Sequence, residues 1–467
     1  MTDVAVSELS TVCPPGHPGY VEAVRIWNAA ISRRPSLVVR CGAAADVAVA
    51  VNHAIAEGLE ISVRGGGHAY SGSALTDGGL MIDLTPMKSV SVDPAAKCVR
   101  CGGGTTWGEL DAATQEHGLA VTGGFISNTG VAGLTLGGGI GWLTRLAGLS
   151  CDNLVSAEVV TADSQIRRAS ADEHTDLFWA IRGGAGNFGV ATEFEFALHP
   201  VGPLINLGLF LFSPADGREM FRFARDYVRT LPDNISPFLA GLNAPPAPFV
   251  PAELHFAPVF ALLVVGLGDA SEHAAAVEPI TAQLSPIVQM LTPMPYTALQ
   301  TMFDESAPWG FYNYEKAVYL EELTDGAIDV IVEHQARKAS PLSFVPMFVM
   351  GGAYGRADPS VSAFGGSRSI RYVINVSATT PTTDGFEAER QWSRDYWAAL
   401  VPHAVGTGSY VNFMAEPDED RVRSTYGAKY PRLQEIKSTY DPHNVFHVNA
   451  NIRPSLSPAV ATPAMLD

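Results

Sequence analysis

The residues best suited to chemistry follow a short hydrophobic run early in the chain, in the segment Arg64-Gly65-Gly66-Gly67-His68-Ala69-Tyr70-Ser71-Gly72. Its three consecutive glycines expose backbone N–H groups with no side chains in the way, which suits a diphosphate. The segment is neither a Rossmann fingerprint nor a P-loop, because no G-x-G-x-x-G helix and no Gly-Lys-Ser/Thr follows. His68 is expected to place its imidazole beside the bound group, although a histidine taken alone is more simply a structural residue.

Two further glycine clusters precede residue 190. One extends from Gly123 to Gly139, and the other extends from Arg182 to Gly189. A single cluster would be interpreted as a turn. Glycine disfavours folding by roughly 0.5–1 kcal/mol per position relative to alanine. Three clusters in one lobe therefore indicate that the backbone passes close to a large ligand, of the size of a dinucleotide.

The elements that position these loops are predicted from the hydrophobic pattern. A strand, a helix and a second strand over 36–41, 44–57 and 58–64 predict a small α/β unit with the first glycine loop at its strand end. The other elements expected before residue 200 are helices over 22–33, 106–117 and 172–181 and strands over 79–84, 89–101, 153–161 and 189–198. Beyond Pro200, strand runs alternate with helices, which predicts a separate lobe built on an antiparallel sheet. The last 50 residues return to polar helix and loop.

Composition limits the classes of protein. The 467 residues require two or three lobes, and 47% hydrophobic against 17% charged residues is typical of a well-buried globular protein. The net charge of -18 argues against a nucleic-acid partner, since no basic surplus neutralises phosphates. The N-terminus lacks an apolar signal core, and the apolar run 256–267 is too short to span a bilayer. A cytoplasmic protein with no membrane partner is expected.

The five cysteines do not indicate a disulfide framework, because their number is odd and they are scattered. Cys98 and Cys101 form a C-x-x-C, but no second pair with zinc-finger spacing exists. Both lie in an alternating run, where strand residues three apart point to opposite faces. Reduced structural cysteines and no metal site are expected, with a redox or metal pair as the alternative.

Taken together, the motifs resemble those of the FAD-linked oxidases of the vanillyl-alcohol-oxidase fold with a PCMH-type FAD-binding domain, specifically the berberine-bridge-enzyme-like group of single-histidyl-linked bacterial type. The matching segments occur in the family order over nearly the whole chain. They are 64–68, 123–130, 136–142, 148–154, 176–189, Tyr410-Val-Asn-Phe413, 430–437, 440–446 and 449–452.

The resemblance implies an α+β fold with three parts. A two-lobed FAD-binding domain (a small α/β unit plus a larger α+β unit) covers residues 1–200, and a substrate domain on an antiparallel sheet backed by helices covers 201–407. Residues 408–467 return to the FAD domain. It further implies that FAD is bound covalently through His68 to the flavin 8α-methyl group, which would make the flavin a stronger oxidant.

Other residues of the matching segments are expected to bind the cofactor without a covalent bond, Asn449 and Asn451 as partners of the isoalloxazine. The full set is Arg64, Gly65, Gly66, Gly67, Tyr70, Ser71, Gly123, Ser127, Asn128, Thr129, Gly130, Gly133, Gly137, Gly138, Gly139, Trp142, Asn153, Gly189, Val190, Tyr410, Asn412, Asn449 and Asn451.

Three positions depart from the family pattern. Ile126 stands where many relatives have a second flavin-linking cysteine, so a single link is expected. Phe413 replaces a common catalytic tyrosine, and Val373 replaces a glutamate that acts as base in some members. The proton acceptor is therefore another residue, water or the substrate itself. Tyr410, Tyr372 and Tyr354 are the candidate catalytic residues, with packing as the alternative role of each.

The predicted function is an oxidase that moves a hydride from a C–H next to oxygen or nitrogen of a small substrate to flavin N5 and is reoxidised by O2, giving H2O2. Thr129 is small at a position where a bulky residue blocks oxygen, which favours this over a dehydrogenase with another acceptor. A flavin-binding protein without turnover is the third alternative. An aromatic natural product is expected as substrate, with sugars and alkaloids open. The expected assembly is a monomer or homodimer.

Aromatic residues of the central lobe are expected to shape the substrate pocket, although core packing explains them equally well. They are Phe256, Phe260, Trp309, Phe311, Tyr312 and Tyr314.

Overall fold

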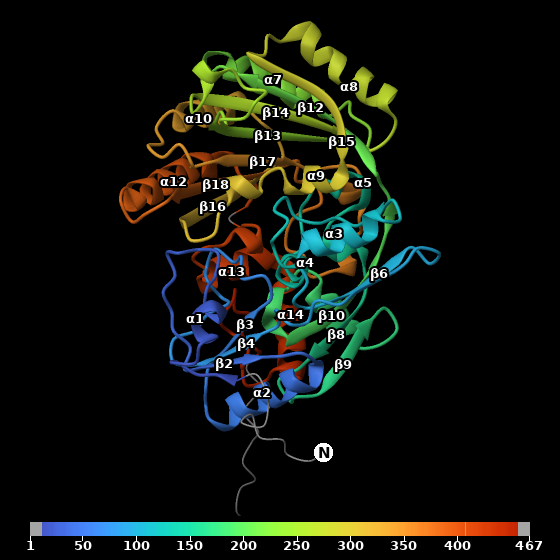
Figure 1. The fold of residues 1–467 in the computed structure, drawn as a ribbon, viewed down its shortest axis with the longest axis vertical. Coiled ribbons are helices and arrows are strands. Elements are labelled where there is room, and N and C mark those ends of the chain that lie inside the picture. Colours follow the sequence, from blue (N-terminus) through green and yellow to red (C-terminus); the bar gives the residue numbers. More distant parts are fainter. Residues whose placement is uncertain (1–11, 407, 456–467) are drawn as a thin grey trace, which may run out of the picture.

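The computed structural model describes residues 12–406 and 408–455, which form two lobes stacked along the long axis of the molecule (Figure 1). The first lobe contains the N-terminal elements and the two C-terminal helices. The second lobe contains the elements between them (Figure 1). The predicted α+β fold is confirmed.

The first lobe begins with a small sheet of order β1-β2-β4-β3 (Val12–Cys13, Leu37–Arg40, Leu80–Asp83, Ile61–Arg64), in which β2, β4 and β3 are parallel. Helix α2 (Ala44–Ala56) packs its buried face on this sheet. Parallel strands end at one edge, so the loop that follows β3 begins at the edge where ligands bind in such sheets.

The predicted helix over 22–33 is wrong beyond its first turn, because α1 ends at Ala23 (Tyr20–Ala23). The backbone N–H of Trp27 donates to Gly67 O, and that of Ala29 donates to Phe311 O. Contacts with distant loops thus replace the hydrogen bonds that would have continued the helix.

A second, antiparallel sheet completes the first lobe in the order β5-β6-β10-β8-β9 (Val90–Asp93, Cys98–Gly102, Val190–Ala197, Leu154–Val160, Ile166–Ser170). It is packed against α3 (Trp107–Gln115), α6 (Thr175–Ile181) and α14 (Tyr430–Tyr440). The run 89–101 is a hairpin, in which Cys98 is partly exposed and Cys101 is buried. All five cysteines are free, and the described residues contain no cluster of three or more possible metal ligands.

The second lobe is a seven-stranded antiparallel sheet of order β15-β12-β14-β13-β17-β18-β16. The strands are β12 (Leu204–Phe212), β13 (Ile235–Asn243), β14 (Pro258–Gly266), β15 (Val288–Pro295), β16 (Tyr312–Leu320), β17 (Val345–Val349) and β18 (Tyr372–Thr380). Its outer face is covered by α7 (Gly217–Tyr227), α8 (Ala270–Gln283), α10 (Asp325–Gln335) and α12 (Phe386–Leu400) (Figure 1).

The alternation of side chains assigns the two faces of this sheet. On β12, Phe210 and Phe212 join the core under the helices, whereas Leu207, Leu209 and Leu211 face the first lobe. The inner face is therefore apolar where the two lobes meet. Shorter elements lie at this junction and around it: β7 (Leu119–Ala120), α4 (Val131–Leu136), α5 (Thr144–Ala147), β11 (His199–Pro200), α9 (Tyr296–Thr301) and α11 (Ala353–Arg356).

The chain returns to the first lobe through α13 (Glu419–Tyr426) and α14. The ion pair of Lys437 and Asp441 lies at the end of α14, with a distance of 2.6 Å and both side chains fully buried. Lys437 Nζ also donates to the carbonyls of Asn187 and Phe446. The pair thereby fixes the C-terminal tail against the third glycine cluster. None of the helices in the described parts of the chain is long and apolar enough to cross a bilayer.

Candidate functional site

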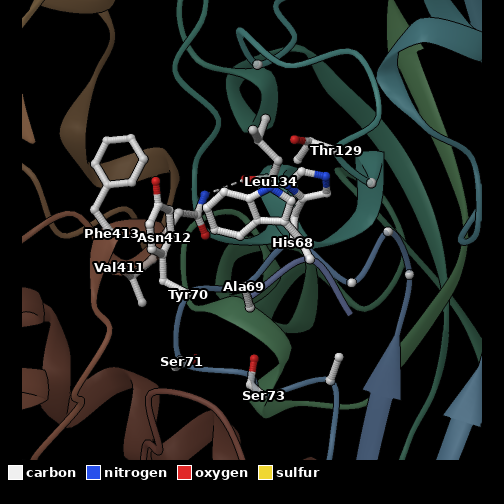
Figure 2. A pocket seen from close by; sticks show the side chains of 18 of the residues that line it. His68, Ala69, Tyr70, Ser71, Ser73, Thr129, Leu134, Val411, Asn412 and Phe413 are labelled. Atoms are coloured by element: carbon white, nitrogen blue, oxygen red, sulfur yellow. Dashed lines mark hydrogen bonds between the residues drawn. The ribbon is translucent and has the colours of Figure 1, made fainter. Parts of the chain in front are cut away.

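A cavity of about 370 Å³ lies where the two lobes and the C-terminal segment meet. Figure 2 shows three segments converging on it: residues 68–73 from the loop after β3, Thr129 and Leu134 from the second glycine cluster, and residues 411–413 from the C-terminal segment. Strands β13, β16, β17 and β18 of the second lobe contribute further lining residues. A volume of this size is typical of a small-molecule or cofactor site.

The first two glycine clusters cross backbone to backbone at the cavity wall. A Cβ on Gly66 would lie 2.2 Å from the amide nitrogen of Gly130, so neither position accommodates a side chain. Gly133, one turn further on, has open space where its Cβ would be and also lines the cavity. The wall is therefore bare backbone, as the glycine density predicts, and offers N–H groups to a phosphate.

His68 lines the cavity and is held between aromatic rings. Trp27 stacks on its imidazole with ring centroids 5.3 Å apart, and Trp309 meets it edge-on at 5.5 Å. Its Nε2 is hydrogen-bonded to Asn128 Oδ1, which also accepts from Trp309 Nε1 at 3.2 Å. Burial lowers the pKa of His68 to about 4, although the bond to Asn128 acts in the opposite direction. The imidazole is therefore neutral at neutral pH.

Two buried polar atoms of the cavity wall, Ser62 Oγ and Asn449 Oδ1, have no hydrogen-bond partner in the protein. A buried polar atom without a partner is costly, so a polar ligand is expected to satisfy both. Together with the bare glycine backbone and the length of the cavity from β3 to β18, they fit FAD. When bound, FAD would supply a two-electron acceptor beside the substrate.

Most residues predicted to bind the cofactor line this cavity. They are Gly65, Gly66, Gly67, His68, Tyr70, Ser71, Thr129, Gly130, Gly133, Gly189, Val190, Tyr410, Asn412 and Asn449.

The other predicted residues do not line the cavity, because their groups are engaged elsewhere in the protein. The Arg64 guanidinium donates to the carbonyl of Ala23, and Asn153 donates to Ala147 O and Leu149 O. Ser127 is bonded to Asp304 through its backbone N–H and its hydroxyl. Asn128 lies behind His68 and contacts it from there.

The remaining corrections concern packing. Methyl groups on Gly123, Gly137, Gly138 and Gly139 would overlap Trp107, Asn412, Phe364 and Ser150, so these glycines allow close packing of the second cluster. Trp142 is buried against Phe125 and Phe238, and Asn451 is buried with its Oδ1 unpaired but outside the cavity wall.

Of the three candidate catalytic tyrosines, only Tyr410 lines the cavity. Its hydroxyl accepts from Gly139 N at 2.7 Å and from Asn412 Nδ2 at 2.9 Å, which ties the second cluster to the C-terminal segment. Burial raises the pKa of Tyr410 despite these bonds, so its phenolate is disfavoured. Tyr410 therefore fits a positioning role better than that of a base.

The hypotheses for Tyr354 and Tyr372 are wrong. Tyr372 lies on β18 with its side chain in the core under the helices, because it alternates with the cavity-lining Asn375 and Ser377. Tyr354 is fully buried and donates its hydroxyl to Ser367 O at 2.7 Å. Neither reaches the cavity.

The substrate end of the cavity is aromatic, but the residues differ from those expected. None of Phe256, Phe260, Trp309, Phe311, Tyr312 and Tyr314 lines the cavity. Phe260, for example, lies in the core under the helices. The aromatic wall consists instead of Phe125, Phe238, Phe303, Phe344, Phe348 and Phe413. No Asp, Glu, Lys or Arg among the described residues lines the cavity.

A polar row opposes this aromatic wall and was missed by the sequence analysis. Asn313 of β16 and Asn375, Ser377 and Thr379 of β18 line the cavity. The signal was available in β18, where polar residues occupy every second position of an otherwise hydrophobic strand. A flat aromatic molecule with one hydrogen-bonding edge fits between the two walls.

Comparison with known proteins gives the following matches. Residues 35–170 match the model of the FAD binding domain, and residues 409–453 match the model described as berberine and berberine like. The (R)-6-hydroxynicotine oxidase of Paenarthrobacter nicotinovorans is 31% identical over 454 residues, which cover 94% of this chain and 96% of that protein.

Solved structures show the same fold. The 6-hydroxy-D-nicotine oxidase of Arthrobacter nicotinovorans superposes with a TM-score of 0.85 and 28% identity, over 95% of this chain and 98% of that one. The glucooligosaccharide oxidase of Acremonium strictum, described with a 6-S-cysteinyl, 8α-N1-histidyl FAD, also gives 0.85, at 23% identity over 95% and 97%.

Proposed function

Because this chain belongs to the berberine-bridge-enzyme-like family of FAD-linked oxidoreductases, we propose that it is an oxidase that carries FAD covalently on His68 and oxidises a small, neutral, aromatic substrate with O2 as the final electron acceptor. The observation that carries the proposal is the cavity itself. It joins a bare glycine wall, a neutral histidine and an uncharged aromatic chamber in one continuous space.

The hydrogen bonds around His68 support its role as the attachment site. Trp309 Nε1–H can only donate, so the Asn128 atom that receives it must be the amide oxygen. The same oxygen contacts His68 Nε2, which must therefore carry the proton. Nδ1 then keeps its lone pair and is the nitrogen available to bond the flavin 8α carbon.

The chamber supports a neutral aromatic substrate over an oligosaccharide or a cation. Six phenylalanines form one wall and short polar side chains form the other, with no charged side chain among the described lining residues. Burying a charged substrate there would cost free energy without a compensating partner. Aromatic rings gain about 0.5–1.5 kcal/mol per well-placed pair beyond the burial of their area.

The test is anaerobic reduction of the yellow protein by a substrate panel. Neutral polycyclic or monocyclic aromatic alcohols are expected to bleach the flavin absorbance, and admission of air is expected to restore it with formation of one H2O2 per flavin. Cello-oligosaccharides of matched concentration serve as the comparison set. Bleaching by oligosaccharides alone would reject the substrate class, and bleaching by no compound would favour a flavin-binding protein without turnover.

Thr129 tests the use of oxygen. It lines the cavity beside the crossing of Gly66 and Gly130, and its backbone N–H and carbonyl are both hydrogen-bonded. Thr129→Leu is expected to fill the space over the ring and to slow reoxidation by roughly tenfold or more, a barrier increase of at least about 1.4 kcal/mol. Stopped-flow mixing of the reduced protein with aerated buffer measures this rate.

Thr129→Ser is the matched control, since it keeps the side chain small and should be reoxidised like the parent. A dehydrogenase of the same fold would show slow reoxidation already in the parent, and no further effect of leucine.

A further inference from the structure

We propose that Glu315 is the final proton acceptor of the oxidation and that Tyr70 relays the proton of the substrate's hydroxyl group to it. The proposal rests on the proposed oxidase function. It answers a need that the sequence leaves open, because Phe413 and Val373 stand where acid–base residues are expected and Tyr410 is committed to the Gly139 amide.

The sheet places Glu315 in the polar row of the cavity. Strand β16 is the edge strand beside β18, and their antiparallel register sets Glu315 opposite Ser377 and Asn313 opposite Thr379. Directly opposed residues share a face of the sheet. Glu315 therefore lies on the face that turns Asn313, Ser377 and Thr379 to the cavity.

The Glu315 carboxyl is fully buried and incompletely satisfied. Its Oε2 accepts from Asn375 Nδ2 at 2.7 Å, whereas its Oε1 has no hydrogen-bond partner. A native structure retains such a group at a cost to stability, and active sites are where this is expected.

Tyr70 connects this carboxyl to the cavity. It follows His68 by two positions in the loop that would hold the ring, and it lines the cavity (Figure 2). Its side chain interacts with Glu315, and its hydroxyl lies 3.4 Å from Ser377 Oγ. Trp27 packs edge-on against its ring at 4.9 Å, and Asn28 Nδ2 donates to its carbonyl at 2.9 Å. The phenol is thus fixed between substrate and Glu315.

The charges around Glu315 make it a strong acceptor in its ionised form. Burial raises the pKa of Glu315 well above its usual range, while the hydrogen bond from Asn375, the positive charge of Arg421 on α13 and the bond to Tyr70 lower it. Burial and the charge of Glu315 raise the pKa of Tyr70. Tyr70 therefore acts as a relay that keeps a proton throughout, and Glu315 as the base.

The step balances as follows. The C–H bond of the alcohol carbon breaks with its electron pair leaving as hydride to the oxidised flavin, and the O–H pair becomes the second bond of the carbonyl. The hydroxyl proton moves to Tyr70 Oη as the proton of Tyr70 moves to Glu315. The alcohol is oxidised by two electrons, the flavin is reduced by two, and Glu315 ends protonated.

Glu315→Gln tests the base while keeping the size of the side chain. Anaerobic flavin reduction by a hydroxylated aromatic substrate is measured by stopped flow from pH 5 to 10. In the parent, the rate constant is expected to rise with pH as Glu315 ionises. In the variant it is expected to fall by about 10²–10⁴-fold, the usual range for a lost general base, and to lose this rise.

The unfolding temperature separates this role from a structural one. Removing an incompletely paired buried carboxylate is expected to leave Tm unchanged or to raise it. Glu389→Gln is the matched control, because Glu389 is equally buried in the same lobe but accepts from Ala339 N, Ser340 N and Ser343 Oγ. That variant is expected to lower Tm and to leave the rate of reduction and its pH profile unchanged.

Tyr70→Phe tests the relay without altering the buried carboxylate. It is expected to slow reduction, and the double variant with Glu315→Gln is expected to be no slower than the slower single one, because both act in one path. If Glu315→Gln is reduced at the parental rate with the parental pH profile, the relay is refuted and the oxidase function stands. If no hydroxylated substrate reduces the parent, both proposals fall.

Discussion

Replacing His68 by alanine is expected to give a protein that releases all of its flavin on acid denaturation, whereas the parent keeps its flavin through the same treatment. The physical reason is that His68 presents a neutral imidazole, fixed by Trp27, Trp309 and Asn128, at the end of the bare glycine wall. Intact mass under denaturing conditions and the absorbance of the acid precipitate measure the covalent fraction. The variant is also expected to be reduced more slowly by substrate, because a histidyl link makes the flavin a stronger oxidant.

His447→Ala is the matched control for this experiment. His447 is another histidine of the cavity wall, but its ring nitrogens are bonded to Asn444 O and Glu60 Oε1. It is expected to retain the covalent flavin. A parent protein that releases all of its pigment in acid, or a His68→Ala variant that keeps it, would remove the basis for the attachment site.

Replacing Lys437 by methionine is expected to lower the free energy of unfolding by about 3–5 kcal/mol, the usual cost of leaving a buried charge without its partner. The Asp441 carboxylate would then be uncompensated at full burial. Asp441 also accepts from the backbone N–H groups of Val445 and Phe446, so the loss would loosen the tail that carries the cavity residues 446–450. Urea unfolding followed by circular dichroism measures stability, and flavin fluorescence reports release of the cofactor.

Arg337→Met is the control for a charge lost at the surface. Arg337 and Glu333 form an ion pair with the same i,i+4 spacing, but their side chains are 58% and 55% exposed. Exposed pairs contribute about 0–1 kcal/mol, so this variant is expected to unfold almost like the parent. Equal losses in the two variants would mean that burial of the Lys437 pair does not govern the stability of the C-terminal tail.

The glycine clusters illustrate what could be predicted without a structure. A residue without a side chain is needed wherever the backbone meets another backbone or a ligand, and this requirement is visible at each position separately. Gly66 and Gly130 satisfy it against each other at the cavity, whereas Gly137 and Gly139 satisfy it against protein side chains. The sequence could not separate these two cases, because both need the same residue.

Strand β18 illustrates the second limit. Its alternation predicts that Tyr372 and Val373 point to opposite faces, but the period is symmetric and does not say which face meets the cavity. The answer depends on the four helices that cover the outer face of the sheet, and these put Tyr372 in their core. The polar residues Arg64 and Asn153 were misassigned for a related reason, since nearby backbone carbonyls accept from them.

The sequence by itself determined the features that are local along the chain: the bare backbone of the glycine loops, the imidazole next to Gly67, and the alternation that builds the large sheet. Only the tertiary structure decided which distant side chains meet. Tyr70, Glu315 and Asn375 lie far apart in the chain, and their contact depends on strand register and on the packing of one lobe against the other. Such contacts arise from the summed packing of many residues, so no short segment of sequence specifies them.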